Sequence, residues 1–189
     1  MSSTQSRRPE VRMPDRGTVA GSASTDRSGA VVRYVGAALR LSLGWVFLWA
    51  FLDKAFGLGR GTAGKDAWFS GGSPTNGFLA FGTKGPFKDV YQGIAGQSWA
   101  DVLFMVGLLG IGVALIAGVA MRIAAGSGAL LLVLMWTAVL PPDNNPFMDD
   151  HLVYAMILVV LAAIGAGRTL GLGRTWEQLP VVKDNSWLK

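Results

Sequence analysis

The sequence contains no cysteine, and this absence excludes several kinds of redox centre. Without a thiolate the chain offers no disulfide, no CxxC redox pair and no cysteine-ligated zinc or iron–sulfur site. It also has one histidine, His151, so it cannot supply both ligands of a bis-histidine haem. We therefore expect no metal, haem or iron–sulfur cluster, and any electron chemistry needs an organic carrier or a partner subunit.

Charged residues are also scarce. They make up 15% of the 189 residues, whereas hydrophobic residues make up 51%, and an average soluble domain carries roughly 25% charged residues. The charge is concentrated in residues 1–30, and four later stretches have almost none. This composition excludes a soluble enzyme and predicts an all-α integral membrane protein.

Four apolar segments reach or approach the length of a membrane span, which is about 20 residues. The sequence shows no period-two alternation of the kind found in membrane β-barrels. We expect a bundle of four transmembrane helices within a membrane domain of residues 31–171. The predicted spans are about 31–56, 99–120, 123–140 and 151–166.

The distribution of Arg and Lys predicts the orientation, because cytoplasmic loops are enriched in these residues. Eleven lie in residues 1–33, between the second and third spans, or after the fourth span, against five in residues 54–88 on the opposite side. We expect a multi-pass protein of the cell membrane with both termini in the cytoplasm. Residues 1–30 are interpreted as a disordered basic tail and residues 172–189 as a cytoplasmic C-terminal tail. No nucleic-acid-binding motif accompanies the basic charge.

The segment between the first two spans, residues 57–98, is unusually long at about 42 residues. It mixes glycine with aromatic residues, and Ser73 before Pro74 is typical of a helix N-terminus. We expect an extracytoplasmic loop with short helices, which either anchors the protein at the membrane interface or covers a site. Within the second span, Gly110, Ala114 and Gly118 form a stripe of small residues that predicts close helix packing.

Arg40 is the most informative single residue. It lies about 10 Å inside the first span by helical rise, and no carboxylate of the chain is expected at its depth. A buried arginine costs about 2.5–3.5 kcal/mol unless it finds a partner or water. Either it reaches lipid phosphates or makes structural hydrogen bonds, or it faces an anionic or carbonyl-bearing ligand.

A second group of candidates lies near the outer ends of the spans. Carboxylates at a helix N-terminus are favourable, so a capping role for Asp149 or Asp150 is one interpretation. The other is a proton path, in which His151 with Asp150 or Asp53 exchanges protons with a quinol headgroup. We take Arg40, Asp150 and His151 as candidate catalytic residues, and as candidate quinone- or substrate-binding residues Trp45, Trp49, Asp53, Lys54 and Trp136.

Several motifs resemble the DoxX family of membrane proteins. The first span carries Arg40, Leu41, Gly44 and Phe47, with Lys54 before a glycine-rich stretch, and residues 165–171 resemble the family's closing motif. Residues 72–79 and 145–151 are closer to its DoxD-like branch. The likeness covers roughly residues 31–171, but Leu172-Gly173-Arg174 stands where the commoner ending has an Asp.

The resemblance implies a four-helix membrane fold. It also implies a connection with thiosulfate:quinone oxidoreductase, which oxidises thiosulfate to tetrathionate, passes electrons to quinone and acts with a partner, DoxA. The expected function is therefore a membrane subunit of a quinone-linked oxidoreductase, associated with the lipid bilayer, a partner protein subunit and quinone. The alternative is a non-catalytic membrane scaffold or anchor for a partner oxidoreductase or respiratory complex. A transporter is a third interpretation, but no pair of broken helices supports it.

Overall fold

The computed structural model describes residues 16–189, with side chains from Arg27 onward. It divides into two units, residues 1–32 and 33–189. Helix α1, Arg16–Phe56, begins in the first unit and ends in the second. Residues 16–30, predicted as part of a disordered tail, are helical, since extending an existing helix needs no new nucleus. Residues 1–15 of that predicted tail lie outside the described residues.

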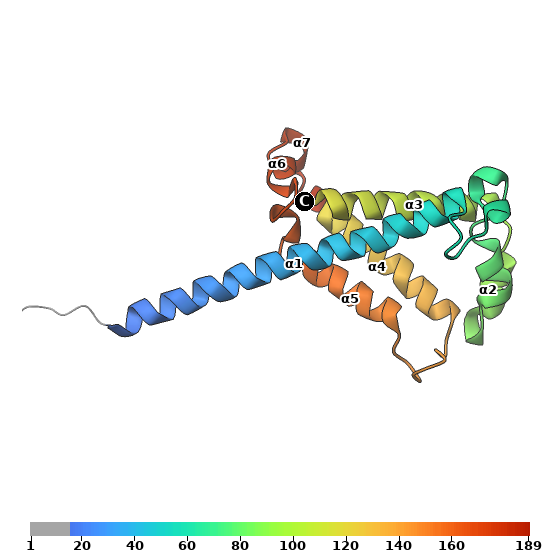
Figure 1. Ribbon diagram of the computed structural model, residues 1–189, viewed down its shortest axis with the longest axis horizontal. Coiled ribbons are helices and arrows are strands. Elements are labelled where there is room, and N and C mark those ends of the chain that lie inside the picture. Colours follow the sequence, from blue (N-terminus) through green and yellow to red (C-terminus); the bar gives the residue numbers. More distant parts are fainter. Residues whose placement is uncertain (1–15) are drawn as a thin grey trace, which may run out of the picture. The chain divides into compact units, whose positions relative to one another are not determined.

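The second unit is built from helices (Figure 1). Besides the end of α1 it contains α3 (Ser98–Ala117), α4 (Met121–Ala138) and α5 (Asp150–Ala163). No strand occurs in residues 16–189, as the composition predicted. Three helices are long and apolar enough to cross a membrane: Arg27–Phe56, α3 and α4. Their positions agree with the first three predicted spans within a few residues.

Helix α5 is shorter than a standard span. Its 14 residues correspond to about 21 Å of helix, against a hydrocarbon core of about 30 Å. After its polar first residues, Asp150 and His151, it is apolar and packs against α4, with Leu158 and Leu161 fully buried. Gly165, at φ +64°, ends it at about the position where the predicted fourth span ends.

Two glycines bring α1 and α3 into close contact. A Cβ on Gly112 would lie 2.8 Å from the backbone nitrogen of Leu48, and a Cβ on Gly44 would lie 2.9 Å from a side-chain carbon of Ile116. The predicted stripe of small residues in this helix was therefore partly wrong. Gly110 is exposed and has nothing within 4 Å, because it lies two residues, or about 200° of helical rotation, from Gly112.

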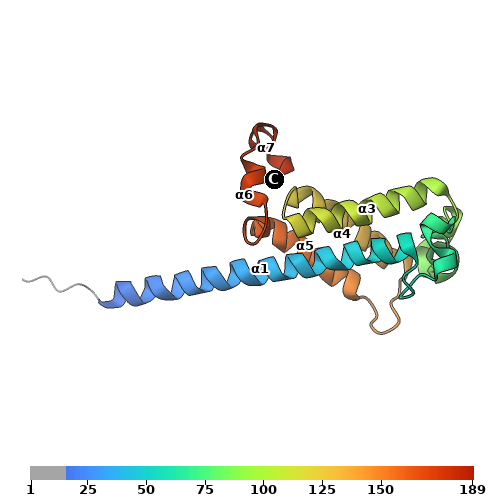
Figure 2. The same ribbon diagram turned by 45° about the horizontal axis from the view of Figure 1, so that its top comes forward.

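The segment between α1 and α3 contains the expected short helices (Figure 2). Ser73 accepts a hydrogen bond from the Asn76 N–H at 3.2 Å, as its position before Pro74 predicted. The helical elements are η1 (Gly64–Asp66), η2 (Trp68–Ser70), η3 (Phe78–Gly82), η4 (Gly85–Phe87) and α2 (Lys88–Gly93). They gather at one end of α3 and α4, here called the loop end.

The C-terminal segment, predicted as a tail, is folded against the opposite end, here called the turn end because it carries the α3–α4 turn (Figures 1 and 2). The Arg122 backbone N–H donates to the main-chain oxygen of Lys189 at 2.8 Å, and Trp176 Nε1 donates to that of Leu188 at 2.7 Å. Val182 is buried. The elements here are η5 (Ala166–Arg168), α6 (Gly173–Glu177), α7 (Pro180–Asp184) and η6 (Ser186–Leu188).

Candidate functional site

Arg40 is completely buried and its guanidinium is surrounded by main-chain carbonyls. Nη1 donates to Leu115 and, at 2.8 Å, to Ile116, while Nη2 donates to Leu170 at 2.8 Å and to Thr169 at 3.3 Å. The first two carbonyls belong to the last turn of α3, where helix carbonyls lack intrahelical partners and the helix dipole favours a cation. Arg40 thus connects the end of α3 to the segment after α5.

Two glycines leave the space that this arginine occupies. A Cβ on Gly118 or on Gly171 would lie 3.1 Å from an Arg40 terminal nitrogen. Among the described residues Arg40 Nε is the only buried side-chain nitrogen or oxygen atom without a partner. This geometry favours the structural hydrogen bonding anticipated for Arg40, and its catalytic role stays a prediction.

Asp53 is buried at the loop end of α1 and organises the turn that follows. Its two carboxylate oxygens accept the backbone N–H groups of Arg60 at 3.1 Å and Gly61 at 2.8 Å. Backbone N–H groups directed at a carboxylate form charge-assisted hydrogen bonds, which are stronger than neutral ones. Asp53 is therefore held by the chain's own backbone, and the neighbouring Lys54 is half-buried in the same last turn.

Asp101, in the first turn of α3, has a corresponding role that the sequence did not reveal. One of its oxygens accepts hydrogen bonds from Ser73 Oγ at 2.9 Å, Thr75 Oγ1 at 2.6 Å and the Thr75 N–H at 3.1 Å. The partners lie more than twenty residues away, so no local spacing indicates the contact. Asp101 fixes the segment between α1 and α3 onto the bundle.

The first turn of α5 holds the only histidine of the sequence. Asp149 caps this helix, because one of its oxygens accepts the Leu152 N–H at 3.2 Å. Its other oxygen lies 2.7 Å from His151 Nδ1, and an oxygen of the exposed Asp150 lies 3.5 Å from the same atom. The capping interpretation is confirmed for Asp149. The same contacts leave His151 next to two carboxylates, which is the arrangement that a proton path needs.

The predicted aromatic residues lie on two surfaces. The rings of Trp45 and Trp49 have centroids 5.7 Å apart on one face of α1, as their spacing predicted, and Trp45 is exposed. Trp136, near the end of α4, packs edge-on against Phe147 at 5.0 Å and donates from Nε1 to the Phe147 carbonyl at 2.8 Å. Trp136 therefore holds the loop that leads to His151.

A cavity of about 420 Å³ lies beside that loop. We call it the loop-end cavity. Its wall combines apolar side chains with charged ones, and Lys84 forms an ion pair with Asp143 there. The lining residues are Lys84, Val139, Pro142, Asp143, Asn144, Met148, Asp149 and Asp150.

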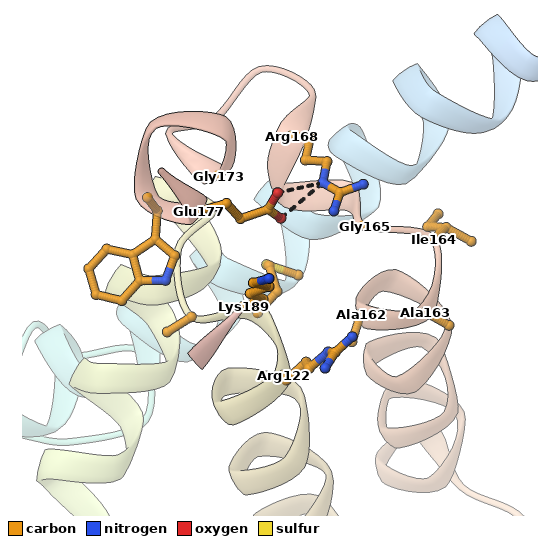
Figure 3. Close-up of a pocket in the computed structure, with 14 residues that line it drawn as sticks. Arg122, Ala162, Ala163, Ile164, Gly165, Arg168, Gly173, Glu177 and Lys189 are labelled. Carbon is orange, nitrogen blue, oxygen red and sulfur yellow. Dashed lines mark hydrogen bonds and ion pairs between the residues drawn. The ribbon is translucent and has the colours of Figure 1, made fainter. Parts of the chain in front are cut away.

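A second cavity, of about 150 Å³, lies at the turn end, and we call it the turn-end pocket (Figure 3). Arg122, Arg168, Glu177 and Lys189 line it together with residues at the start of α4 and the end of α5. Arg168 Nε donates to both oxygens of Glu177, at 2.9 and 3.0 Å. In the sequence these cations indicate only the orientation, because the Arg168–Glu177 pair forms only when the C-terminal segment folds.

The predicted site residues do not form one site. Asp150 and His151 begin α5 at the loop end, and Asp53 lies at the loop end of α1. Arg40 contacts the turn end of α3, about 20 Å from Asp53 by helical rise. Arg40, with its hydrogen bonds to main-chain carbonyls, is therefore separated from the polar group of Asp149, Asp150 and His151 at the loop end, which has the residue types needed for proton transfer.

The apolar helices define the class of molecule: it is a helical, multi-pass membrane protein. Comparison with protein-family models, with curated proteins and with solved structures finds no match for this chain.

Proposed function

We propose that this chain is a membrane subunit of a quinone-linked oxidoreductase, with four transmembrane helices and both termini in the cytoplasm. The case for α5 as the fourth span rests on where its ends lie. Helix α5 begins beside the loop that Trp136 holds at the loop end. A few residues after the end of α5, the Leu172 N–H donates to the carbonyl of Ala117 at 2.8 Å, at the turn end of α3. Helix α5 with its flanking residues thus extends from the loop end to the turn end beside α4. Anchoring residues and a thinner local bilayer accommodate a short span.

The proposed quinone-headgroup site is the loop-end cavity. The observation that carries it is the 2.7 Å contact between His151 Nδ1 and Asp149, at the edge of that cavity. Histidine exchanges protons near neutral pH, and a carboxylate on Nδ1 orients its ring. The cavity volume lies within the range of about 300–1,000 Å³ typical of small-molecule sites, and its wall mixes apolar and polar groups as a quinone ring requires.

In this proposal the chain's residues bind the headgroup and move protons. Asp150 and His151 take up or release protons at the cavity, Lys84 and Met148 line it, and Trp136 keeps the α4–α5 loop in place. A bound quinone would accept the two electrons released when two thiosulfate anions join as tetrathionate, together with two protons. Thiosulfate as donor rests on the family resemblance, and a partner subunit supplies the electron-transfer centre that this cysteine-free chain lacks.

The proposal is tested by thiosulfate-dependent quinone reduction in membranes of the native host. The assay compares the wild type, a strain lacking this chain, and His151→Asn and Asp150→Asn variants at equal protein levels. Asp89→Asn, an exposed acid on α2 outside the cavity lining, is the matched control. We expect activity to be lost in the deletion strain and reduced at least tenfold in His151→Asn, but unchanged in Asp89→Asn.

The second candidate is the non-catalytic scaffold. One observation favours it: within residues 27–189 the three buried charged residues, Arg40, Asp53 and Asp101, all form hydrogen bonds with the chain's own backbone or loops. A scaffold predicts that a partner protein dissociates from the membrane in the deletion strain but stays bound when His151→Asn is introduced, with full activity. Activity lost in His151→Asn with the partner still bound supports the quinone-site proposal instead.

A further inference from the structure

The turn-end pocket has an excess of positive charge. Three cationic side chains, Arg122, Arg168 and Lys189, share it with one acid, Glu177 (Figure 3). Glu177 is occupied on both oxygens by Arg168 Nε, so its charge offsets one cation at most. The α-carboxylate of Lys189 also lies at the pocket, where one of its oxygens accepts the Arg122 N–H, so about one uncompensated positive charge remains around a volume of about 150 Å³.

Most of the hydrogen-bond donors of these cations are free. Arg122 uses Nη1 to donate to the Ser186 carbonyl at 2.8 Å, and Arg168 uses Nε for Glu177. Neither the terminal nitrogens of Arg168 nor Lys189 Nζ forms a hydrogen bond within residues 27–189. Guanidinium and ammonium groups with open donors match the oxygens of a phosphate group.

The pocket also lies at one end of the apolar helices, which is the level where lipid headgroups are expected. It sits where the membrane-crossing helix α4 begins, beside the end of the apolar helix α5. Ala162, Ala163 and Ile164 form part of its wall. Large apolar side chains are exposed at the end of α5 and the start of α4, namely Val160, Ile164 just after α5, and Ile123, and these surfaces can contact acyl chains.

From these observations we infer that the turn-end pocket binds the phosphate headgroup of an anionic phospholipid. Arg122, Arg168 and Lys189 contact the phosphate oxygens, and the acyl chains lie along the exposed faces of α4 and α5. Basic pockets between transmembrane helices are suited to such headgroups, and each nearby cation contributes about a fivefold gain in affinity for an anionic surface. The inference is independent of the quinone-site proposal, because it concerns the other end of the bundle.

The apolar wall of the pocket favours a phospholipid over free inorganic phosphate as the ligand that supplies the phosphate group. An inorganic anion gains nothing from Ala163 or Ile164, whereas a phospholipid buries its chains against them. The bound lipid would also hold the C-terminal segment on the bundle, since Arg122 and Lys189 belong to elements already joined by a backbone hydrogen bond. We therefore expect phospholipid binding to raise the thermal stability of the protein.

The experiment uses the purified full chain in detergent, stripped of lipid. Native mass spectrometry and thermal unfolding are recorded with phosphatidylglycerol, with phosphatidylcholine and with inorganic phosphate. The test variant is Arg122→Gln with Lys189→Gln, and the matched control is Arg174→Gln with Lys183→Gln, which removes one Arg and one Lys from the same end but outside the pocket. We expect phosphatidylglycerol to be retained and to raise Tm, with affinity reduced about 25-fold in the test variant and unchanged in the control.

If the double variant unfolds, the single variant Lys189→Gln replaces it in the test. Its folding should be unaffected, because the Lys189 side chain makes no hydrogen bond in the described structure. It is expected to lower the affinity about fivefold. Three results would overturn the inference: equal effects of the test and control variants, equal retention of phosphatidylcholine, or an equal Tm increase from inorganic phosphate. The last result would identify free phosphate as the ligand.

Discussion

Arg40 in α1 donates from Nη1 to the main-chain oxygen of Ile116 in α3 at 2.8 Å, joining two helices whose residues lie 76 positions apart. The same guanidinium also reaches the segment after α5. A single buried cation thus donates to carbonyls of two segments, the end of α3 and residues 169–170. Its position within a membrane span is explained by these acceptors.

Replacing Arg40 by alanine should destabilise the protein by about 3 kcal/mol or more, because it leaves the carbonyls of Ile116, Thr169 and Leu170 without their donor. Arg40→Lys should recover only part of this, since one ammonium cannot reach both groups of carbonyls. Thermal unfolding in detergent measures the loss. Arg33→Ala, on the exposed surface of the same helix, is the comparison and should change little.

Substitution of two glycines in α3 should have opposite effects. Gly112→Ala places a methyl group against the backbone of Leu48 and should cost about 1–3 kcal/mol. Gly110→Ala meets open space and should stabilise the helix by about 0.5–1 kcal/mol. Thermal unfolding of both variants tests the packing face of α3, and equal effects would contradict it.

Removing the carboxylate of Asp101 should release the segment between α1 and α3. Asp101→Ala deletes the acceptor for Ser73 and for both donors of Thr75, so hydrogen exchange and limited proteolysis should increase across residues 70–80. Asp89→Ala removes an exposed acid from the same end of the bundle and should leave this protection intact. Unchanged protection in Asp101→Ala would show that other contacts hold the segment.

Substitutions at the N-terminus of α5 should lower the stability of the protein less than Arg40→Ala does, and the two acids there should differ in effect. Asp149→Ala removes the cap on the Leu152 N–H and the partner of His151, and should cost about 1 kcal/mol. Asp150→Ala keeps the cap and loses only a favourable charge at the helix start, so its effect should be about 0.3–1 kcal/mol. The order of the two unfolding temperatures checks the assignment of the cap.

The absence of cysteine makes the topology directly measurable. Asn144→Cys lies in the exposed α4–α5 loop and Gln178→Cys in the exposed C-terminal segment. In intact cells a membrane-impermeant maleimide should label only Asn144→Cys, and Gln178→Cys should react only after permeabilisation. Labelling of both in intact cells would mean that α5 does not cross the membrane.

The sequence alone determined the class of fold and most of the helix positions. Long uncharged segments have few alternatives to a membrane helix, because the backbone must satisfy its own hydrogen bonds in lipid. The position of Asp149 before an apolar helix and that of Ser73 before Pro74 likewise predicted local caps, since capping depends on neighbours in sequence.

What the tertiary structure decided is which distant groups meet. Arg40 with Ile116, Asp101 with Thr75, and Arg168 with Glu177 follow from helix packing and from the folding of the C-terminal segment, and no local pattern encodes them. The tertiary structure also decided which face of α3 packs against α1. Gly110 and Gly112 are the same residue type, but only Gly112 lies on the face that contacts α1. Periodicity fixes a helix and its ends, whereas its contacts depend on the shapes and charges of the elements brought against it.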